Sequence, residues 1–131
     1  MSALARRVAA AFFIAHGIAH LVGFVAAWQL TDLKDAPYST VILNGALDVG
    51  DAGMRVMGVL WIAAAAAFAG AALAVIRGSY QIVAAVTVFS LVVCVLGLPR
   101  AVAGVSIDVV ILAVLAGLAI ARPTALRPAV R

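Results

Sequence analysis

Residues 56–76 read VMGVLWIAAAAAFAGAALAVI, an apolar run without a single charged side chain. A helix needs about 20 mostly apolar residues to cross the hydrocarbon core of a bilayer. Extended by two residues at its start, this run is one of four that meet the requirement, at residues 8–30, 54–76, 81–98 and 104–121. The sequence therefore predicts an all-α membrane protein, an antiparallel up-down bundle of four transmembrane helices forming a single domain over residues 1–131.

The composition agrees with that fold class. Hydrophobic residues make up 67% of the chain and charged residues 11%, against roughly half and a quarter in soluble domains. The net charge of +4 does not indicate nucleic acid binding, because the basic residues stand at the ends of apolar runs and form no patch beside stacking aromatics. The single cysteine, Cys94, excludes an intrachain disulfide.

The positive charges predict how the bundle is oriented. The basic residues on one side are Arg6, Arg7, Arg77, Arg122, Arg127 and Arg131, and those on the other are Lys34, Arg55 and Arg100. Lys and Arg favour the cytoplasmic side, so both termini are expected in the cytoplasm of a bacterial inner membrane. A cleaved signal peptide is the alternative for the first run, but its length and its two histidines favour a retained span.

The loop at residues 31–53 is the only long connection, and it is expected on the outer side. Two strand-like stretches, residues 39–43 and 46–49, flank Asn44 and Gly45. An Asn-Gly pair favours the two-residue hairpin turn that needs positive φ at both positions. We expect a short β-hairpin that lies over the bundle as a lid, with an irregular loop as the alternative.

Two histidines lie in the first span, where ionisable side chains are costly. His16 and His20 are four residues apart, so they share one helix face near the middle of the bilayer. Such residues usually face the bundle interior and are candidates for function. The alternative is that each ring only forms hydrogen bonds with neighbouring helices and fixes their packing.

A metal ion, haem or a polar pocket would each use this pair differently. Histidines at i and i+4 can bind one metal ion, but further ligands are needed, and only Cys94 and Asp108 are available within the spans. Both are expected about 5–10 Å nearer the outer surface than the histidines. Haem would require a dimer, because two histidines of one helix cannot bind opposite faces of one iron. A polar pocket or a proton path is the third reading.

Asp108 is expected about one turn inside the outer end of the fourth span. A partly buried carboxylate seeks a cation, and Arg100 or Arg55 is the nearest by depth. One reading is an ion pair that fixes the outer ends of the spans. The other makes Asp108 a wall of a cavity that opens outward and reaches His20.

Two further residues are predicted to belong to that cavity. Ser90 is expected at the level of His20 and can donate a hydrogen bond to it. Trp61 lies deeper in its span than the interfacial aromatic residues do, so we expect it to line the same cavity.

Three short runs carry a resemblance. AHGIAHLVGF at residues 15–24, LDVGDAGMR at 47–55 and GVLW at 58–61 resemble the corresponding parts of small, uncharacterised four-span bacterial membrane proteins. More distantly, the layout is similar to the DoxX-like superfamily, whose members are associated with redox complexes or quinone-linked chemistry. The chain departs from that superfamily in its second histidine and in lacking an acidic residue within the second span, so the resemblance transfers no catalytic role.

The usual catalytic motifs are absent from the sequence: there is no glycine-rich phosphate loop, no pair of carboxylates in a span and no CxxC. The leading hypothesis is therefore a non-catalytic membrane protein that binds a lipophilic molecule or a partner subunit in a pocket. The predicted lining residues are His16, His20, Trp61, Ser90 and Asp108. One alternative is a redox enzyme or accessory subunit with haem, metal or quinone at the histidines. The other is a small transporter that works as a dimer.

Overall fold

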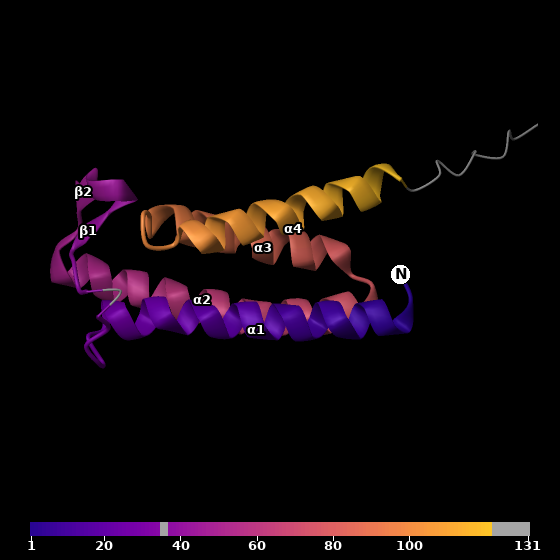
Figure 1. The fold of residues 1–131 in the computed structure, drawn as a ribbon, viewed down its shortest axis with the longest axis horizontal. Helices are drawn as coiled ribbons and strands as arrows, with labels where there is room; N and C mark the ends of the chain where they lie inside the picture. Colours follow the sequence, from indigo (N-terminus) through magenta and orange to yellow (C-terminus); the bar gives the residue numbers. More distant parts are fainter. Residues whose placement is uncertain (35–36, 122–131) are drawn as a thin grey trace, which may run out of the picture.

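Four helices make up most of the computed structural model, which describes residues 1–34 and 37–121. They are α1 (Ala3–Ala27), α2 (Gly50–Arg77), α3 (Tyr80–Leu96) and α4 (Val102–Ile120) (Figure 1). The predicted helical fold class is confirmed, and each predicted span overlaps one helix. Arg122, Arg127 and Arg131, three of the basic residues used to predict orientation, lie outside the described residues.

The ends of the first two helices follow from local chemistry. Ser2 caps α1, because its side-chain oxygen accepts a hydrogen bond from the backbone N–H of Ala5 at 3.2 Å. Helix α2 ends at Arg77 and is capped by Gly78, whose φ of 77° lies in the left-handed region that glycine adopts without strain. The N–H of Ser79 then donates to the carbonyl of Ala74 at 2.8 Å. This compact ending turns the chain directly into α3.

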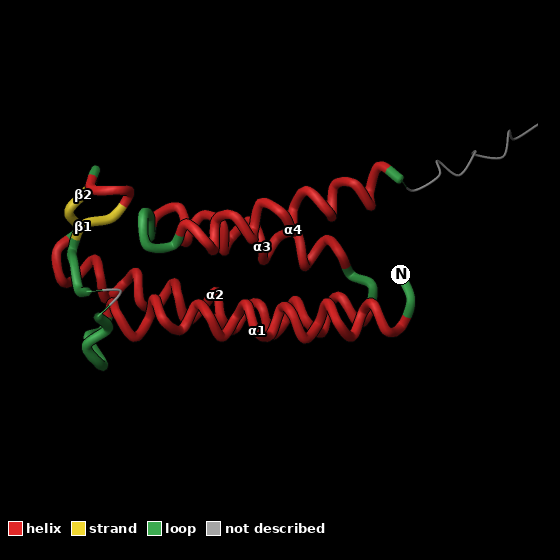
Figure 2. Tube along the Cα trace, in the orientation of Figure 1, coloured by secondary structure: helices red, strands yellow, loops and turns green. Residues whose placement is uncertain are grey.

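The helices pack in the order of the chain: α1 against α2, α2 against α3, and α3 against α4. Helices α1 and α2 form one layer, and α3 and α4 form the other (Figure 1; loops are green in Figure 2). The backbones of the first and last helices lie farther apart, although Phe13 and Ile111 belong to one buried cluster and His16 contacts Asp108. The bundle therefore has an open side between α1 and α4, which we call the α1–α4 seam.

Small residues let the first two helices approach closely. Ala64 and Ala71 of α2 are fully buried. A Cβ placed on Gly17 of α1 would lie 3.0 Å from both the carbonyl oxygen of Ala65 and the Cβ of Phe68. Close backbone approach of this kind is the usual way in which membrane helices gain packing contacts.

Two apolar clusters form the core. The larger lies toward the N-terminal end of α1 and includes Phe13, Phe68, Val75 and Val83. The smaller, formed by Trp61, Val93 and Cys94, lies toward the hairpin. The histidines lie between the two clusters.

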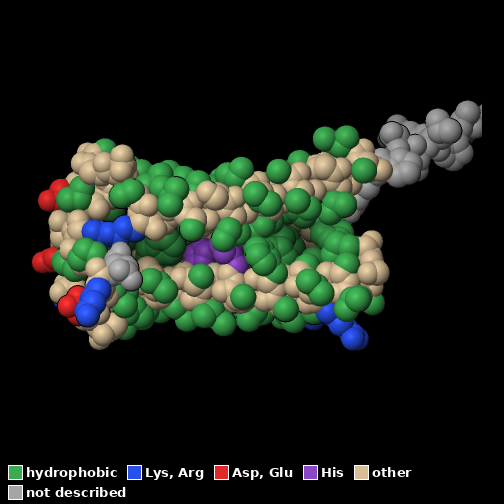
Figure 3. Space-filling model, in the orientation of Figure 1, with side chains coloured by type: hydrophobic (Ala, Val, Ile, Leu, Met, Phe, Trp, Pro, Cys, Tyr) green, Lys and Arg blue, Asp and Glu red, His purple; other side chains and the backbone are tan. Residues whose placement is uncertain are grey.

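Three of the helices, α1, α2 and α4, are long and apolar enough to cross a membrane. Helix α3 is equally apolar but has only 17 residues. Large apolar side chains are exposed along the outside of the bundle, among them Ile18, Val59, Val92 and Val110. Charged side chains gather toward the two ends in Figure 3. Both features suit a surface that is covered by lipid.

The predicted β-hairpin is confirmed, but its turn is longer than the predicted two residues. Strands β1 (Val41–Ile42) and β2 (Leu47–Asp48) are antiparallel, with Ile42 opposite Leu47. Residues 43–46 connect them through a short 3-10 turn, η1 (Leu43–Gly45), in which three successive residues have positive φ. The N–H of Asn44 donates to the carbonyl of Leu98, between α3 and α4, at 2.9 Å. The longer turn reaches the loop between α3 and α4. The hairpin therefore lies across the end of the bundle.

Candidate functional site

Four of the predicted site residues meet in one hydrogen-bonded cluster. His16 and His20 come from α1, Ser90 from α3 and Asp108 from α4, and all four are buried. We refer to these four residues as the polar cluster. They tie three helices together near the middle of the bundle, and every fully buried side-chain nitrogen or oxygen among the described residues has a hydrogen-bond partner.

His20 is held at both ring nitrogens. Its Nδ1 donates to the carbonyl oxygen of His16, one turn earlier in α1, at 2.9 Å. Its Nε2 lies 2.8 Å from the hydroxyl oxygen of Ser90, the contact expected from the sequence. Because a carbonyl oxygen only accepts hydrogen bonds, Nδ1 carries a hydrogen.

Asp108 is fully buried, and each of its carboxyl oxygens has one partner. Oδ1 lies 3.1 Å from Nε2 of His16, and Oδ2 lies 2.7 Å from the hydroxyl oxygen of Ser90. The predicted ion pair of Asp108 with Arg55 or Arg100 is not formed among the described residues. The expectation that Asp108 lies nearer the outer surface than the histidines is also wrong, since it contacts His16 directly.

The physical reason lies in how α4 is placed. A depth counted along each helix separately does not fix how α4 is shifted against α1, and the observed packing brings Asp108 of α4 against His16 of α1. Asp108 is buried on the bundle side of α4, while Arg100 belongs to the loop that precedes this helix. The side chains of His16 and Ser90 provide hydrogen-bond partners for this buried carboxyl group without the cost of burying a guanidinium beside it.

Helix α2 supplies the apolar surroundings of the polar cluster. The ring of Phe68 meets that of His16 edge-on at 4.6 Å between centroids, and the ring of Trp61 lies 5.5 Å from that of His20. Phe68 was not among the predicted site residues. Its position seven residues after Trp61 places both on one face of α2, and that spacing is the signal that would have identified it.

Cys94 borders the polar cluster without completing it. Its sulfur lies 3.8 Å from Nε2 of His20 and 4.0 Å from the hydroxyl oxygen of Ser90, which are weak contacts. A Cβ on Gly104 of α4 would lie 2.6 Å from this sulfur. The glycine therefore lets the start of α4 close against α3 at the thiol.

A cavity of about 340 Å³ opens beside the histidines. His16 and His20 lie at the floor of a hollow between the two helix layers (Figure 3). The walls are mostly apolar and include Trp61, Met57 and Ile42. Of the five predicted lining residues, His16, His20 and Trp61 line this cavity, whereas Ser90 and Asp108 are fully buried behind the histidines.

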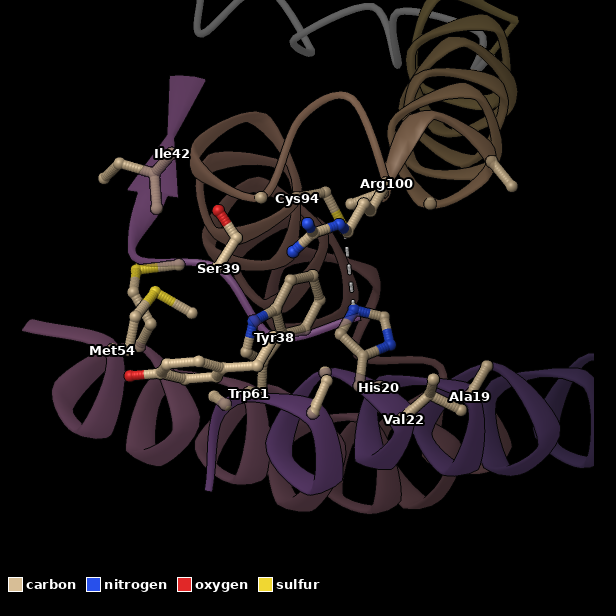
Figure 4. A pocket seen from close by; sticks show the side chains of 18 of the residues that line it. Ala19, His20, Val22, Tyr38, Ser39, Ile42, Met54, Trp61, Cys94 and Arg100 are labelled. Carbon is tan, nitrogen blue, oxygen red and sulfur yellow. Dashed lines mark hydrogen bonds between the residues drawn. The ribbon is translucent and has the colours of Figure 1, made fainter. Parts of the chain in front are cut away.

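The mouth of the cavity lies under the hairpin. Tyr38 and Ser39, from the segment before β1, and Arg100, from the α3–α4 loop, line this end of the cavity, and inside it the His20 ring points toward the sulfur of Cys94 (Figure 4). Arg100 thus borders the cavity without touching Asp108. Arg55 lies elsewhere, where its carbonyl accepts a hydrogen bond from Trp28 Nε1 at 3.1 Å.

A hydrogen bond holds the segment at this mouth. The hydroxyl of Tyr38 donates to Oδ1 of Asp51, in the first turn of α2, at 2.6 Å. This bond to the carboxylate raises the pKa of Tyr38 above its ordinary value of 10.0. The chain between α1 and the hairpin is therefore fastened to the start of α2.

The polar cluster also has the donor set of a metal site. One atom each from His16, His20 and Asp108 lie within 4.8 Å of one another. Imidazole nitrogen and carboxylate oxygen are ligands that zinc and other transition metals accept. Searches for similarity among protein-family models, curated proteins and solved structures find no match to this chain.

Proposed function

We propose that this chain is a non-catalytic protein that spans a bacterial inner membrane four times, with both termini in the cytoplasm, and that its cavity binds a lipophilic small molecule. Helix α3 is the fourth span in this proposal. At about 1.5 Å per residue its 17 residues extend about 25 Å, slightly less than a hydrocarbon core of about 30 Å. The loop residues on either side complete the crossing.

The cavity is the observation that carries the proposal. Its volume of about 340 Å³ falls at the lower end of the range for small-molecule sites, roughly 300–1,000 Å³. Apolar walls with a few convergent polar groups are typical of such sites. Here the polar groups are the two imidazole rings at the floor, which suit the polar end of an otherwise apolar molecule.

The α1–α4 seam supports entry from the bilayer. The cavity is lined from both α1 and α4, and the backbones of these two helices lie farther apart than those of α1 and α2. Lipid would therefore border the seam in a membrane. An apolar molecule dissolved in the bilayer reaches such an opening without passing through water.

The test is native mass spectrometry of protein released gently from a membrane mimetic. We expect a bound small molecule at fixed stoichiometry. Ala26 lines the cavity and is half-buried, so Ala26→Leu should lose the bound mass. Ala66, an exposed alanine of α2 away from the cavity, provides the matched control Ala66→Leu, which should keep it. A bare mass for the unmodified protein, or equal retention by both variants, contradicts the proposal.

A metal ion at His16, His20 and Asp108 is the second candidate, favoured by the proximity of their donor atoms. An ion there would have to replace hydrogen bonds that these groups already make. Stoichiometric zinc, copper or iron in the purified protein, lost in Asp108→Leu, would support it. Purified protein that contains no metal but retains an organic ligand would favour the binding of a lipophilic small molecule. The predictions of a partner subunit and of a dimeric transporter stay predictions.

A further inference from the structure

His16 has one ring nitrogen that the polar cluster does not use. Its Nε2 contacts Asp108, while its Nδ1 makes no hydrogen bond to any described residue. No fully buried side-chain nitrogen among those residues lacks a partner, so Nδ1 is not fully enclosed. His16 lines the cavity beside the hairpin. His16 is thus a cavity-lining residue whose Nδ1 is unpartnered and not fully enclosed.

What Nδ1 can bind depends on whether it carries a hydrogen, and the polar cluster decides this. Three contacts join the four side chains in a row: His20 Nε2 to Ser90, Ser90 to Asp108 Oδ2, and Asp108 Oδ1 to His16 Nε2. At 2.7–3.1 Å each contact contains one hydrogen. Ser90 owns a single hydroxyl hydrogen, so its two contacts need one more from a neighbour.

Two electroneutral arrangements supply that hydrogen. In the first, Ser90 donates to an ionised Asp108 and a protonated His20 donates to Ser90. In the second, a protonated Asp108 donates through Oδ2 to Ser90, and Ser90 donates to a neutral His20. In both, Oδ1 of Asp108 accepts from His16. The hydrogen of His16 is therefore on Nε2, and the Nδ1 of this neutral ring keeps its lone pair.

A third arrangement would reverse His16, and it leaves the polar cluster with a net positive charge. Asp108 would donate through Oδ1 to His16 while Ser90 donated to Oδ2, which requires a protonated His20 with no ionised partner. Within residues 1–34 and 37–121, the side chains around the polar cluster include no compensating anion: α2 contributes Trp61 and Phe68, and α3 contributes the Cys94 thiol. Arg100 at the mouth of the cavity is itself a cation. An uncompensated charge at this depth is strongly disfavoured.

We propose that the occupant of the cavity carries a hydroxyl group, or an equivalent hydrogen-bond donor, that donates to Nδ1 of His16. The inference rests on the proposed function and narrows it to one ligand class, lipophilic alcohols and phenols. An ether or ketone of the same size offers only lone pairs, which would meet the lone pair of Nδ1. A site whose polar group is left unpaired by the wrong ligand discriminates against it.

The experiment compares two isomers of the same size. Nonanol can donate a hydrogen bond, whereas octyl methyl ether can only accept one. Binding is followed in lipid nanodiscs by the fluorescence of Trp61, which lines the cavity. The chain has two tryptophans, so Trp28→Phe leaves Trp61 as the only reporter. We expect nonanol to bind about 3- to 10-fold more tightly than the ether, the equivalent of one neutral hydrogen bond. The preference should disappear in His16→Lys, whose ammonium group still offers Asp108 a donor but has no acceptor.

The outcomes distinguish this inference from the proposed function. Equal binding of the two isomers to the unmodified site overturns the inference and leaves the lipophilic-ligand proposal standing. Absence of saturable binding by either isomer overturns both. An independent reading comes from nitrogen NMR of histidine-labelled protein, where the two histidines are assigned with His16→Gln. We expect His16 with hydrogen on Nε2 alone, and observation of hydrogen on Nδ1 of a neutral His16 overturns the inference without any ligand.

Discussion

Ser90 is the residue that joins the two halves of the polar cluster. Its hydroxyl oxygen lies 2.7 Å from Asp108 and 2.8 Å from His20, and its side chain is fully buried. A hydroxyl both donates and accepts, so Ser90 donates its own hydrogen to one neighbour and accepts a hydrogen from the other. Alanine, although similar in size, cannot replace either contact.

Ser90→Ala should therefore destabilise the protein by about 1–3 kcal/mol, because Asp108 and His20 would each lose a partner in a buried site. The measurement is the unfolding midpoint in a detergent-denaturant titration. Ser106→Ala is the matched control, since Ser106 is exposed and donates only to the carbonyl of Val102 in its own helix, at 3.0 Å. Equal stability of the two variants would show that the polar cluster does not contribute to folding.

The composition of the polar cluster could be predicted from the sequence, but its connections could not. Polar residues within apolar runs stand out, so His16, His20, Ser90 and Asp108 are all identifiable. The pairing of Ser90 with His20 followed from counting helix rise. The partner of Asp108 did not, because the relative shift of α1 and α4 depends on packing around small residues such as Gly104, and periodicity carries no information about that shift.

At the scale of elements, the spacing of α1 and α2 depends on Gly17. Glycine is normally unfavourable within a helix by about 1 kcal/mol relative to alanine. Here its missing side chain allows contact with Ala65 and Phe68. The sequence shows the glycine but not which helix it faces. Gly70 and Gly117 look equivalent in the sequence, yet a Cβ added to either would meet nothing within 4 Å.

Gly17→Ala should push α1 away from α2 and destabilise the bundle by about 1–3 kcal/mol, the usual cost of overpacking. Gly117→Ala should be neutral or stabilising, because its added methyl group meets open space and alanine favours the helix. Both are compared by thermal unfolding in detergent. An equal change in unfolding temperature for both variants would mean that close contact at Gly17 does not set the distance between α1 and α2.

The segment before the hairpin should loosen at high pH. The raised pKa of Tyr38 means that its bond to Asp51 favours the protonated hydroxyl, so the stabilising contribution is complete below about pH 10 and is lost as the pH rises through the raised pKa. Tyrosinate absorbance should show Tyr38 ionising at higher pH in the native protein than in Asp51→Asn. Identical titrations would exclude the Tyr38–Asp51 bond.

At the scale of the whole molecule, the polar cluster is isolated from one end of the bundle. The apolar cluster of Phe13, Phe68, Val75 and Val83 lies toward the N-terminal end of α1, and the row of hydrogen bonds that leaves His16 returns to α1 at His20. The row therefore does not lead from one end of the molecule to the other. The hydrogen bonds between the described side chains of the polar cluster do not form a continuous row across the bundle.

Liposomes containing the protein should accordingly show no proton leak above protein-free liposomes when a pH gradient is imposed. Asp108→Asn should not change this result, whereas the transporter prediction requires flux that falls in this variant. The measurement is the decay of the gradient followed with an internal pH-sensitive dye. Flux in the unmodified protein that Asp108→Asn abolishes would restore the transporter hypothesis.

The α1–α4 seam also determines the concentration scale on which the cavity would work. A site that opens to lipid responds to the mole fraction of ligand in the bilayer rather than to its concentration in water. Partitioning alone enriches an apolar molecule there, so even a modest intrinsic affinity keeps the cavity filled. The surrounding acyl chains, present in great excess, are then the competitors that any occupant must displace.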